Sequence, residues 1–295
     1  MRILVAGGAG FIGSNLCSRL LGDGAEVYCV DNLLTASTRN VRYLQMNRKF
    51  RLLQASVQDI SDFEVDQIYN LASPAAPGDY KAHPKETMAA NVAGTERLLR
   101  MAATCGARML HASTIRVLED VPEDSPHFSY VEGKRKAERL CRKYYDKGTN
   151  VVIARLYNTY GPNMSKTDSR VVPQFVMRAL RGEPLILVGN GEQKDSFCYV
   201  DDMLDGLIAY MNSDIAFGPM EFGYPKMVSI YELAELAKRV IHSDSLIMLN
   251  GQGTAINADR PVPDIREAQT SLGWNPRITL ETGLSRLAEY YRGAA

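Results

Sequence analysis

The sequence predicts an α/β protein built on a doubly wound parallel sheet, with a smaller α/β domain at its C-terminal end. Three observations support this prediction. A glycine-rich turn separates the first apolar run from the first amphipathic run, and short apolar runs then alternate with longer amphipathic ones up to residue 156. After residue 160, glycine and proline become frequent. Strands that alternate with helices form a parallel sheet covered on both faces.

Six short apolar runs are predicted to be buried strands of this sheet. Each is nearly continuous in apolar residues, which is typical of strands buried on both faces. They cover residues 2–6, 26–30, 50–54, 67–72, 107–112 and 151–156. Apolar residues at helical spacing predict helices between them. These helices cover residues 11–21, 84–104 and 130–147.

The second half of the chain has shorter elements between turns such as "YGPNM" and "FGPMEFGYP". Ser229 and Glu232 form a capping-box pattern that predicts a helix through Ile241. Residues 277–292 predict a last amphipathic helix.

Length and composition limit the domain number and the class of protein. The 295 residues allow one large domain or two. We expect residues 1–165 to form a first domain, onto which roughly 195–222 pack back, and residues 166–295 to form most of a second. Thirty-four basic residues balance thirty-four acidic ones, so no nucleic-acid partner is expected. No apolar run is long enough to cross a bilayer, so no membrane partner is expected either.

Cysteine and histidine usage indicates a reducing compartment. The five cysteines are widely spaced, without a Cys-x-x-Cys pair, and the four histidines show no metal-ligand spacing. We therefore predict a cytoplasmic protein with no disulfide framework and no metal site.

The opening stretch "RILVAGGAGFIGSNL" places Gly7, Gly10 and Gly13 between a strand and a helix. Gly7 permits a tight turn, Gly10 lets a pyrophosphate approach the backbone, and Gly13 lets helix and strand pack closely. The helix N-terminus offers N–H groups to the phosphates. The second strand ends at Asp31, whose carboxylate would accept hydrogen bonds from ribose hydroxyls and repel a 2′-phosphate. The first domain is therefore predicted to be Rossmann-type and to bind NAD rather than NADP.

A second group of residues predicts chemistry beside that cofactor. Tyr130 and Lys134 lie four residues apart, which places both side chains on one face of a helix. A nearby ammonium lowers the pKa of a phenol, so that the phenol can act as a base nearer neutral pH. Ser113 and Thr114 supply hydroxyls at a predicted strand end.

With these motifs the chain resembles the extended short-chain dehydrogenase/reductase family, also described as NAD-dependent epimerases and dehydratases, whose members act on nucleotide sugars. The resemblance covers nearly the whole chain and includes "GGAGFIGSNL", "EGKRKAE", "ARLYNTYGPNM" and "SFCYVDDMLDGL". It is closest to the UDP-glucuronate decarboxylase (UDP-xylose synthase) branch, which "LASPAAP" and "PDI" followed by "LGW" suggest. It implies a homodimer formed through the helices at 84–104 and 130–147.

The resemblance also implies roles. NAD accepts a hydride from sugar C4 while Tyr130 takes the hydroxyl proton, Thr114 hydrogen-bonds that oxygen, and Lys134 holds the ribose. The resulting 4-ketone lies β to a carboxylate, so CO₂ can leave before the hydride returns. The implied NAD-binding residues are Gly7, Gly10, Phe11, Ile12, Gly13, Asp31, Asn32, Leu71, Ala72, Ser73, Asn91, Ser113, Tyr130 and Lys134. Those implied for a nucleotide-sugar substrate are Thr114, Arg116, Tyr130, Asn158, Arg170, Val171 and Arg260.

The chain departs from the family pattern at the substrate. Decarboxylases read Ser-Thr-Ser-Glu where this chain reads Ser-Thr-Ile-Arg at residues 113–116. Arg116 therefore replaces the acidic residue to which the family assigns a role in decarboxylation. Asp195 and Asn163 stand where many relatives carry arginines, and losing an arginine near a diphosphate removes a charge-assisted fork. The candidates for compensating this loss of positive charge are Lys166, Arg170, Arg178 and Arg260.

These departures leave three functions open: a decarboxylase, a 4-epimerase or related enzyme on an altered substrate in specialised metabolism, and a non-catalytic NAD-binding protein. The retained set of Thr114, Tyr130 and Lys134 argues against the third. Two interpretations of Arg116 also stay open. It either pairs with Glu119 or Asp120 in solvent, or lies in the pocket facing a substrate carboxylate or phosphate.

Overall fold

The structure is a computed structural model that describes residues 1–250 and 261–293. The chain forms two compact units. The first contains Met1–Leu156 and Leu207–Met220, and the second contains Tyr157–Gly206 and Glu221–Ala295. The chain thus leaves the first unit at Leu156 and returns to it at Leu207.

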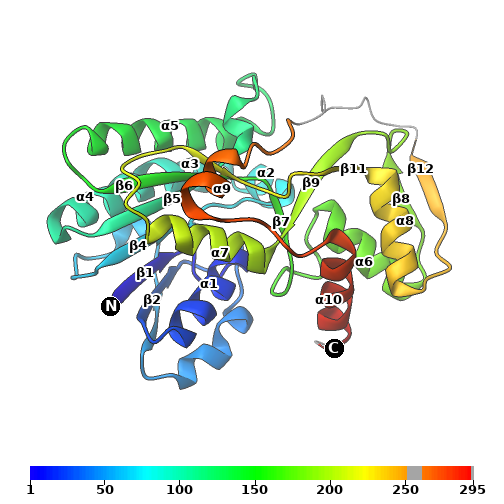
Figure 1. Cartoon of the computed structure of the whole chain (residues 1–295), viewed down its shortest axis with the longest axis horizontal. Helices are drawn as coiled ribbons and strands as arrows, with labels where there is room; N and C mark the ends of the chain where they lie inside the picture. Colours follow the sequence, from blue (N-terminus) through cyan, green and yellow to red (C-terminus); the bar gives the residue numbers. More distant parts are fainter. Residues whose placement is uncertain (251–260, 294–295) are drawn as a thin grey trace. The chain divides into compact units, whose positions relative to one another are not determined.

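A seven-stranded sheet has the order β3-β2-β1-β4-β5-β6-β10, and its strands from β3 to β6 form the centre of the first unit (Figure 1). The strand pairs from β3 to β6 are parallel. The order reverses at β1, as in dinucleotide-binding sheets, which confirms the predicted fold class. The strands are β1 (Arg2–Ala6), β2 (Glu26–Asp31), β3 (Phe50–Gln54), β4 (Gln67–Asn70), β5 (Arg108–Thr114), β6 (Val151–Leu156) and β10 (Met220–Phe222).

Helices cover both faces of this sheet: α4 (Thr95–Cys105) and α5 (Phe128–Tyr145) lie on one face and α1 (Phe11–Gly22) on the other (Figure 1). The predicted helix at 84–104 consists of α3 (Pro84–Ala89), one π-helical turn at Ala90–Gly94, and α4. The short helix α2 (Pro77–Ala82) precedes it, and both short helices begin with proline, whose φ suits a first helical position.

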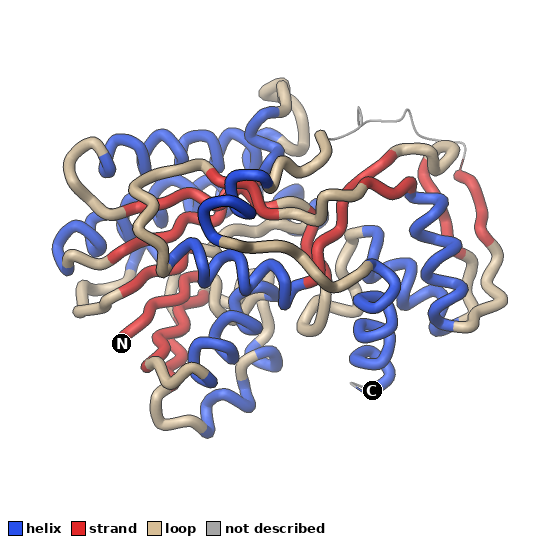
Figure 2. Tube along the Cα trace, in the orientation of Figure 1, coloured by secondary structure: helices blue, strands red, loops and turns tan. Residues whose placement is uncertain are grey.

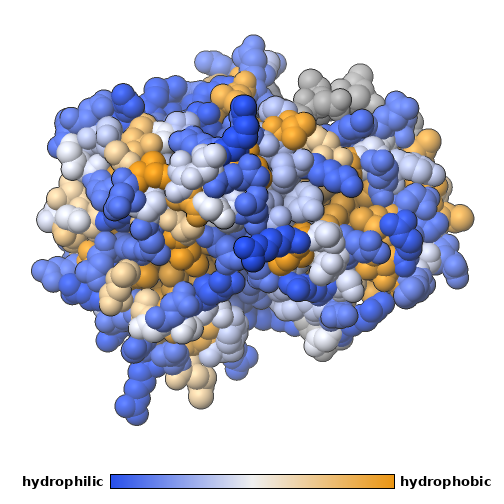
Figure 3. Space-filling model, in the orientation of Figure 1, coloured by the Kyte–Doolittle hydropathy of each residue, from blue (hydrophilic) through white to orange (hydrophobic). Residues whose placement is uncertain are grey.

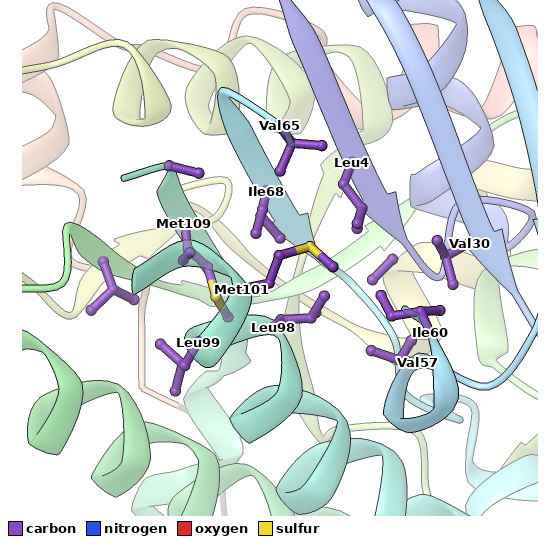
Figure 4. Packing of buried hydrophobic residues seen from close by; sticks show 14 of the residues in the cluster. Leu4, Val30, Val57, Ile60, Val65, Ile68, Leu98, Leu99, Met101 and Met109 are labelled. Atoms are coloured by element: carbon purple, nitrogen blue, oxygen red, sulfur yellow. The ribbon is translucent and has the colours of Figure 1, made fainter. Parts of the chain in front are cut away.

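The apolar stripe of α4 explains why this helix packs on the sheet. Leu98, Leu99 and Met101 are fully buried and point toward strand residues such as Ile68 and Met109 (Figure 4). Burying a leucine side chain completely stabilises a fold by roughly 1.5–3 kcal/mol. This packing fixes the strand ends that carry the site residues.

The second unit contains two small sheets, in the orders β11-β9-β7 and β12-β8, with helices beside them (Figure 2). The helix α8 begins after Ser229, and the predicted capping box with Glu232 is present. The helix α7 (Val200–Met211) runs from the second unit into the first. The other elements of this unit are β7 (Asn158–Tyr160), α6 (Val171–Arg181), β8 (Leu185–Val188), β9 (Lys194–Tyr199), β11 (Met227–Ser229), α8 (Ile230–Ile241), β12 (Ile247–Asn250), α9 (Arg266–Leu272) and α10 (Leu280–Gly293).

The parallel pair β8 and β12 exposes apolar side chains. Ile186, Val188, Met248 and Leu249 are each more than two-fifths exposed, and hydrophobic atoms appear over this pair in Figure 3. Among the described residues, no helix has the length and hydropathy needed to span a membrane.

Candidate active site

The glycine-rich turn follows β1 and has little room for side chains. Gly7 has φ +73°, and a Cβ on it would lie 2.8 Å from the carbonyl carbon of Leu71. A Cβ on Gly13 would overlap the Gly7 carbonyl oxygen and approach the Gly8 Cα to 2.7 Å. A Cβ on Gly10, by contrast, would meet only the Gly7 oxygen, at 3.2 Å, among the described residues beyond its chain neighbours. The turn needs Gly7 and Gly13 for packing, and Gly10 leaves its face open to a ligand.

The helix α1 begins at Phe11, directly after this turn. No side chain caps its N-terminus, and its first turn contains no acidic residue. The backbone N–H groups of a first helical turn, including Phe11 and Ile12 here, attract anions. The turn and helix therefore fit the pyrophosphate of a dinucleotide.

Asp31 ends β2 beside the turn and is 8% exposed. Its carboxylate accepts hydrogen bonds from the backbone N–H of Ala9 at 3.0 Å and of Leu33 at 2.9 Å. Burial raises the pKa of Asp31, and the backbone N–H donors oppose this effect. The next residue, Asn32, donates to the Ser56 hydroxyl at 3.1 Å. This edge of the sheet therefore carries the predicted ribose-binding residues.

The loop after β4 brings Leu71, Ala72 and Ser73 to the same turn, since the Leu71 N–H donates to the Ala6 carbonyl at 2.9 Å. Asn91 is fully buried in the π-helical turn, and its amide donates to Ser73 Oγ at 3.0 Å. The Asn91 Oδ1 atom has no hydrogen-bond partner within the described part of the chain. π-Helical turns frequently occur at functional sites. Asn91 thus fixes the loop and keeps an acceptor for another group.

Tyr130 and Lys134 lie on α5 as predicted, and both are buried. The Lys134 ammonium donates to the Ala112 carbonyl at 2.7 Å, which ties α5 to the end of β5. Ser113 and Thr114 are the last two residues of β5. The strand therefore extends two residues beyond its predicted end at 112 and includes the hydroxyl pair. The Thr114 hydroxyl accepts the Arg116 N–H at 3.3 Å, and a hydroxyl that accepts one hydrogen bond can still donate its own proton.

Burial dominates the acid–base behaviour of Lys134. Desolvation lowers the pKa of this ammonium from 10.5 to about 8, although Cys141 and Glu138 act in the opposite direction. The buried His111 on β5 stays neutral, because burial and then Lys134 lower its pKa well below the ordinary value. The site therefore holds a lysine that can lose its proton in mildly alkaline solution.

We predict that Lys134 makes the free energy of unfolding of the NAD-free protein rise between pH 8 and pH 10.5. Across this window the unfolded chain still holds a lysine proton that the folded chain has released, so the unfolded state binds more protons. Over this pH range the free energy of unfolding should rise by on the order of 3 kcal/mol more in the original protein than in Lys134→Met. Urea unfolding of both proteins across this range measures the difference, and a difference that stays constant with pH would contradict the prediction.

Glu138 extends the face of α5 that carries Tyr130 and Lys134. Its carboxylate accepts the Ser113 hydroxyl at 2.5 Å and a fork from Arg155 at 3.0 and 2.7 Å. Both charged side chains are less than a fifth exposed. Glu138 and Arg155 were not among the residues predicted from the sequence, although Glu138 lies four residues after Lys134 and repeats the helical spacing. This network orients Ser113 toward α5.

We predict that Arg155→Met destabilises the protein by about 2 kcal/mol, because it leaves the Glu138 carboxylate buried without its cation. Arg139→Met is the matched control, since Arg139 pairs with Glu132 on the same helix but is 63% exposed. This exposed pair should contribute less than about 0.5 kcal/mol. Chemical denaturation measures both variants, and equal losses would refute the prediction.

Arg116 lies in the 3₁₀ turn Ile115–Leu118 that follows β5. Its side chain is 13% exposed and forms a fork with Glu119 at 2.9–3.0 Å. Its Nη1 atom also donates to the Tyr80 hydroxyl at 3.1 Å. Arg116 pairs with Glu119, as the first of the two interpretations of this residue expected, but the arginine side chain is largely buried rather than solvated.

Three of the predicted substrate residues belong to the second unit. Asn158 begins β7, and Val171 begins α6. Arg170 precedes α6 and forms a fork with Asp168 at 2.9 and 2.6 Å. Arg260 lies outside the described residues.

Two of the positions that depart from the family pattern, Asn163 and Asp195, also lie in the second unit. Asn163 adopts φ +68°, which asparagine tolerates, and accepts the Tyr290 hydroxyl at 3.0 Å. Asp195 lies on β9 opposite Val228. Arg178 donates to the Pro184 carbonyl at 3.0 Å. Within residues 1–250 and 261–293, no cluster of three metal-ligating side chains occurs.

The fold and the site together are those of the short-chain dehydrogenase/reductase class. They combine a glycine turn before a helix, an acidic residue ending the second strand, and a tyrosine and a lysine four residues apart beside a hydroxyl pair. Residues 3–219 match the NAD dependent epimerase/dehydratase family, and the chain belongs to that family. Its cofactor is NAD, as the sequence predicted.

Curated relatives match almost the entire chain. UDP-glucuronic acid decarboxylase 1 from Xenopus tropicalis is 41% identical over 305 residues, which cover 99% of this chain and 72% of the relative. UDP-glucuronic acid decarboxylase 5 from Arabidopsis thaliana is 40% identical over 99% of this chain and 89% of its own length.

Solved structures share the fold. The UDP-glucose 4-epimerase from Thermotoga maritima, solved with UDP-glucose, has a TM-score of 0.89 and 26% identity, covering 100% of this chain and 99% of its own. The UDP-glucuronic acid 4-epimerase from Bacillus cereus, solved with UDP-glucuronic acid and NAD, has a TM-score of 0.83 and 24% identity over the full length of both chains.

Proposed function

We propose that the protein is an NAD-dependent decarboxylase of UDP-glucuronate that oxidises sugar C4 transiently. One observation carries the proposal: about 40% identity to curated UDP-glucuronic acid decarboxylases across 99% of the chain. The 4-epimerase alternative is less favoured, because the epimerases among the similar structures share only 22–26% of their residues with this chain. The substrate is therefore a nucleotide sugar acid, and the products are UDP-xylose and CO₂.

The residues of α5 and β5 supply the proton chemistry of this proposal. NAD, when bound, supplies the acceptor for the C4 hydride and later returns it. Tyr130 takes the C4 hydroxyl proton, and Thr114 donates a hydrogen bond to the same oxygen. Lys134 holds the ribose and favours the phenolate of Tyr130.

Arg116 does not by itself exclude decarboxylation. Once C4 is a ketone, the sugar is a β-keto acid, and the electron pair of the breaking C–C bond moves into the ketone oxygen to give an enolate. A proton then returns to C5. The residue at position 116 can tune this step, but the ketone supplies the driving force. The non-catalytic alternative is disfavoured because Thr114, Tyr130 and Lys134 are all retained.

The test incubates the purified protein with UDP-glucuronate and analyses the products. We expect CO₂ and UDP-xylose in equal amounts. Formation of the 4-epimer without CO₂ would establish the epimerase instead, and absence of turnover with NAD bound would refute the proposal. Size-exclusion chromatography with light scattering tests the homodimer, which we propose from family resemblance alone.

A further inference from the structure

Tyr80 on α2 lies directly against the proposed base. Its ring stacks on the Tyr130 ring, with centroids 5.0 Å apart and 15° between the planes. Tyr80 is only 1% exposed, and together with Tyr130 and Val131 it forms a small apolar cluster separate from the main core. A stacked aromatic neighbour restricts how far a ring can tilt or shift.

The Tyr80 hydroxyl has a donor on one side and an acceptor on the other. Arg116 Nη1 donates to it at 3.1 Å, and His127 Nδ1 lies 2.6 Å from it. Arg116 Nη1 also lies 3.5 Å from His127 Nδ1, and a guanidinium can only donate, so Nδ1 is an acceptor and the Tyr80 hydroxyl donates to it. This direction requires the His127 tautomer that carries its proton on Nε2.

Hydrogen bonds hold both the side chain of Arg116 and the turn that carries it. Glu119 binds its guanidinium as a fork at 2.9–3.0 Å. Arg135 on α5 donates to the backbone carbonyls of Val117, at 2.8 Å, and of Glu119. The turn that carries Arg116 is therefore bound to the helix that carries Tyr130, and Tyr80 lies against both.

We propose that Tyr80 is a positioning residue for Tyr130, and that Arg116 and His127 hold Tyr80 in place. The proposal rests on the proposed function, which makes Tyr130 the base. It assigns Arg116 a role that a glutamate could not fill, because a carboxylate would accept the Tyr80 proton and compete with His127. A base must lie within about 3 Å of the proton that it takes, and a misplacement of about 1 Å can cost roughly 100-fold in rate.

Two substitutions separate the ring of Tyr80 from its hydroxyl, and a third serves as a control. Tyr80→Leu removes the stack, and Tyr80→Phe keeps the stack but removes the bonds to Arg116 and His127. Tyr43→Leu is the matched control, since Tyr43 is 55% exposed and distant in sequence from these elements. We expect kcat with UDP-glucuronate to fall roughly 30-fold in Tyr80→Leu and roughly threefold to tenfold in Tyr80→Phe. The KM for UDP-glucuronate and the Kd for NAD should stay within about twofold.

A second measurement does not depend on turnover. Protein labelled with ¹³C at the tyrosine Cζ atom is titrated with NAD bound, and the Tyr130 resonance is assigned with Tyr130→Phe. We expect Tyr80→Leu and Tyr80→Phe to move both the Tyr130 resonance and the midpoint of its titration. An unmoved Tyr130 resonance in both variants would overturn the proposal, as would a kcat in Tyr80→Leu within twofold of the unmodified protein. If UDP-glucuronate is not turned over, the proposed function fails, while the titration still tests Tyr80.

Discussion

Replacing Tyr130 with phenylalanine is expected to reduce turnover of UDP-glucuronate by about 10³-fold, within the range that general acid–base catalysis contributes. The substitution removes one oxygen atom and keeps the buried ring that stacks on Tyr80. The fold should therefore persist, and the Kd for NAD should change less than about threefold. Steady-state product analysis and NAD titration by calorimetry measure the two effects.

The matched control is Tyr145→Phe at the end of the same helix. Tyr145 packs on Phe217, with ring centroids 4.6 Å apart, and takes no part in the proposed chemistry. Its substitution should leave kcat within about twofold. A Tyr130→Phe protein that retains more than about a tenth of the original activity would exclude Tyr130 as the base.

Replacing Gly13 with alanine is expected to weaken NAD binding by at least about 100-fold. The new Cβ would overlap the Gly7 carbonyl oxygen and lie 2.7 Å from the Gly8 Cα, and both obstacles are backbone atoms. The turn must move away from α1, and hydrogen bonds to the phosphates would be lost. Each lost bond would weaken NAD binding by about 1.5–3 kcal/mol. Overpacking should also lower the free energy of unfolding by about 1–3 kcal/mol.

Gly22 offers a control on the same helix, because outside its chain neighbours and the backbone of α1 no described atom lies within 4 Å of a Cβ placed there. Gly22→Ala should leave NAD binding unchanged and stabilise α1 by up to about 1 kcal/mol, since alanine is the better helix former. Calorimetric titration with NAD and urea unfolding test both variants. NAD affinity in Gly13→Ala within threefold of the original would contradict the predicted role of this turn.

The departure from the family pattern that lies in the first unit is Arg116. Arg116 on the substrate side belongs to a hydrogen-bonded cluster with Glu119 and Tyr80. Its guanidinium donates to protein groups, so a substrate carboxylate would have to compete with Glu119 for it. This arrangement favours a positioning role for Arg116 over direct binding of substrate.

Local patterns predicted the fold and the elements that carry the cofactor site. The glycine turn, the strand ending at Asp31 and the capping box at Ser229 all depend on neighbours within a few residues. The sequence did not predict features that depend on packing. The interval 84–104 is helical, as predicted, but it contains a π-helical turn, which buries Asn91 beside Ser73.

The sequence alone determined the Rossmann-type fold, NAD as the cofactor, and the shared face of Tyr130 and Lys134, because helical periodicity and glycine sterics are properties of short stretches of chain. Only the tertiary structure decided what these residues contact. Tyr80 reaches Tyr130 from 50 residues away along the chain, and the buried Lys134 ammonium donates to the Ala112 carbonyl. Arg116 meets Tyr80 because α2 and the end of β5 come together. Such contacts depend on how distant elements pack, which no local spacing records.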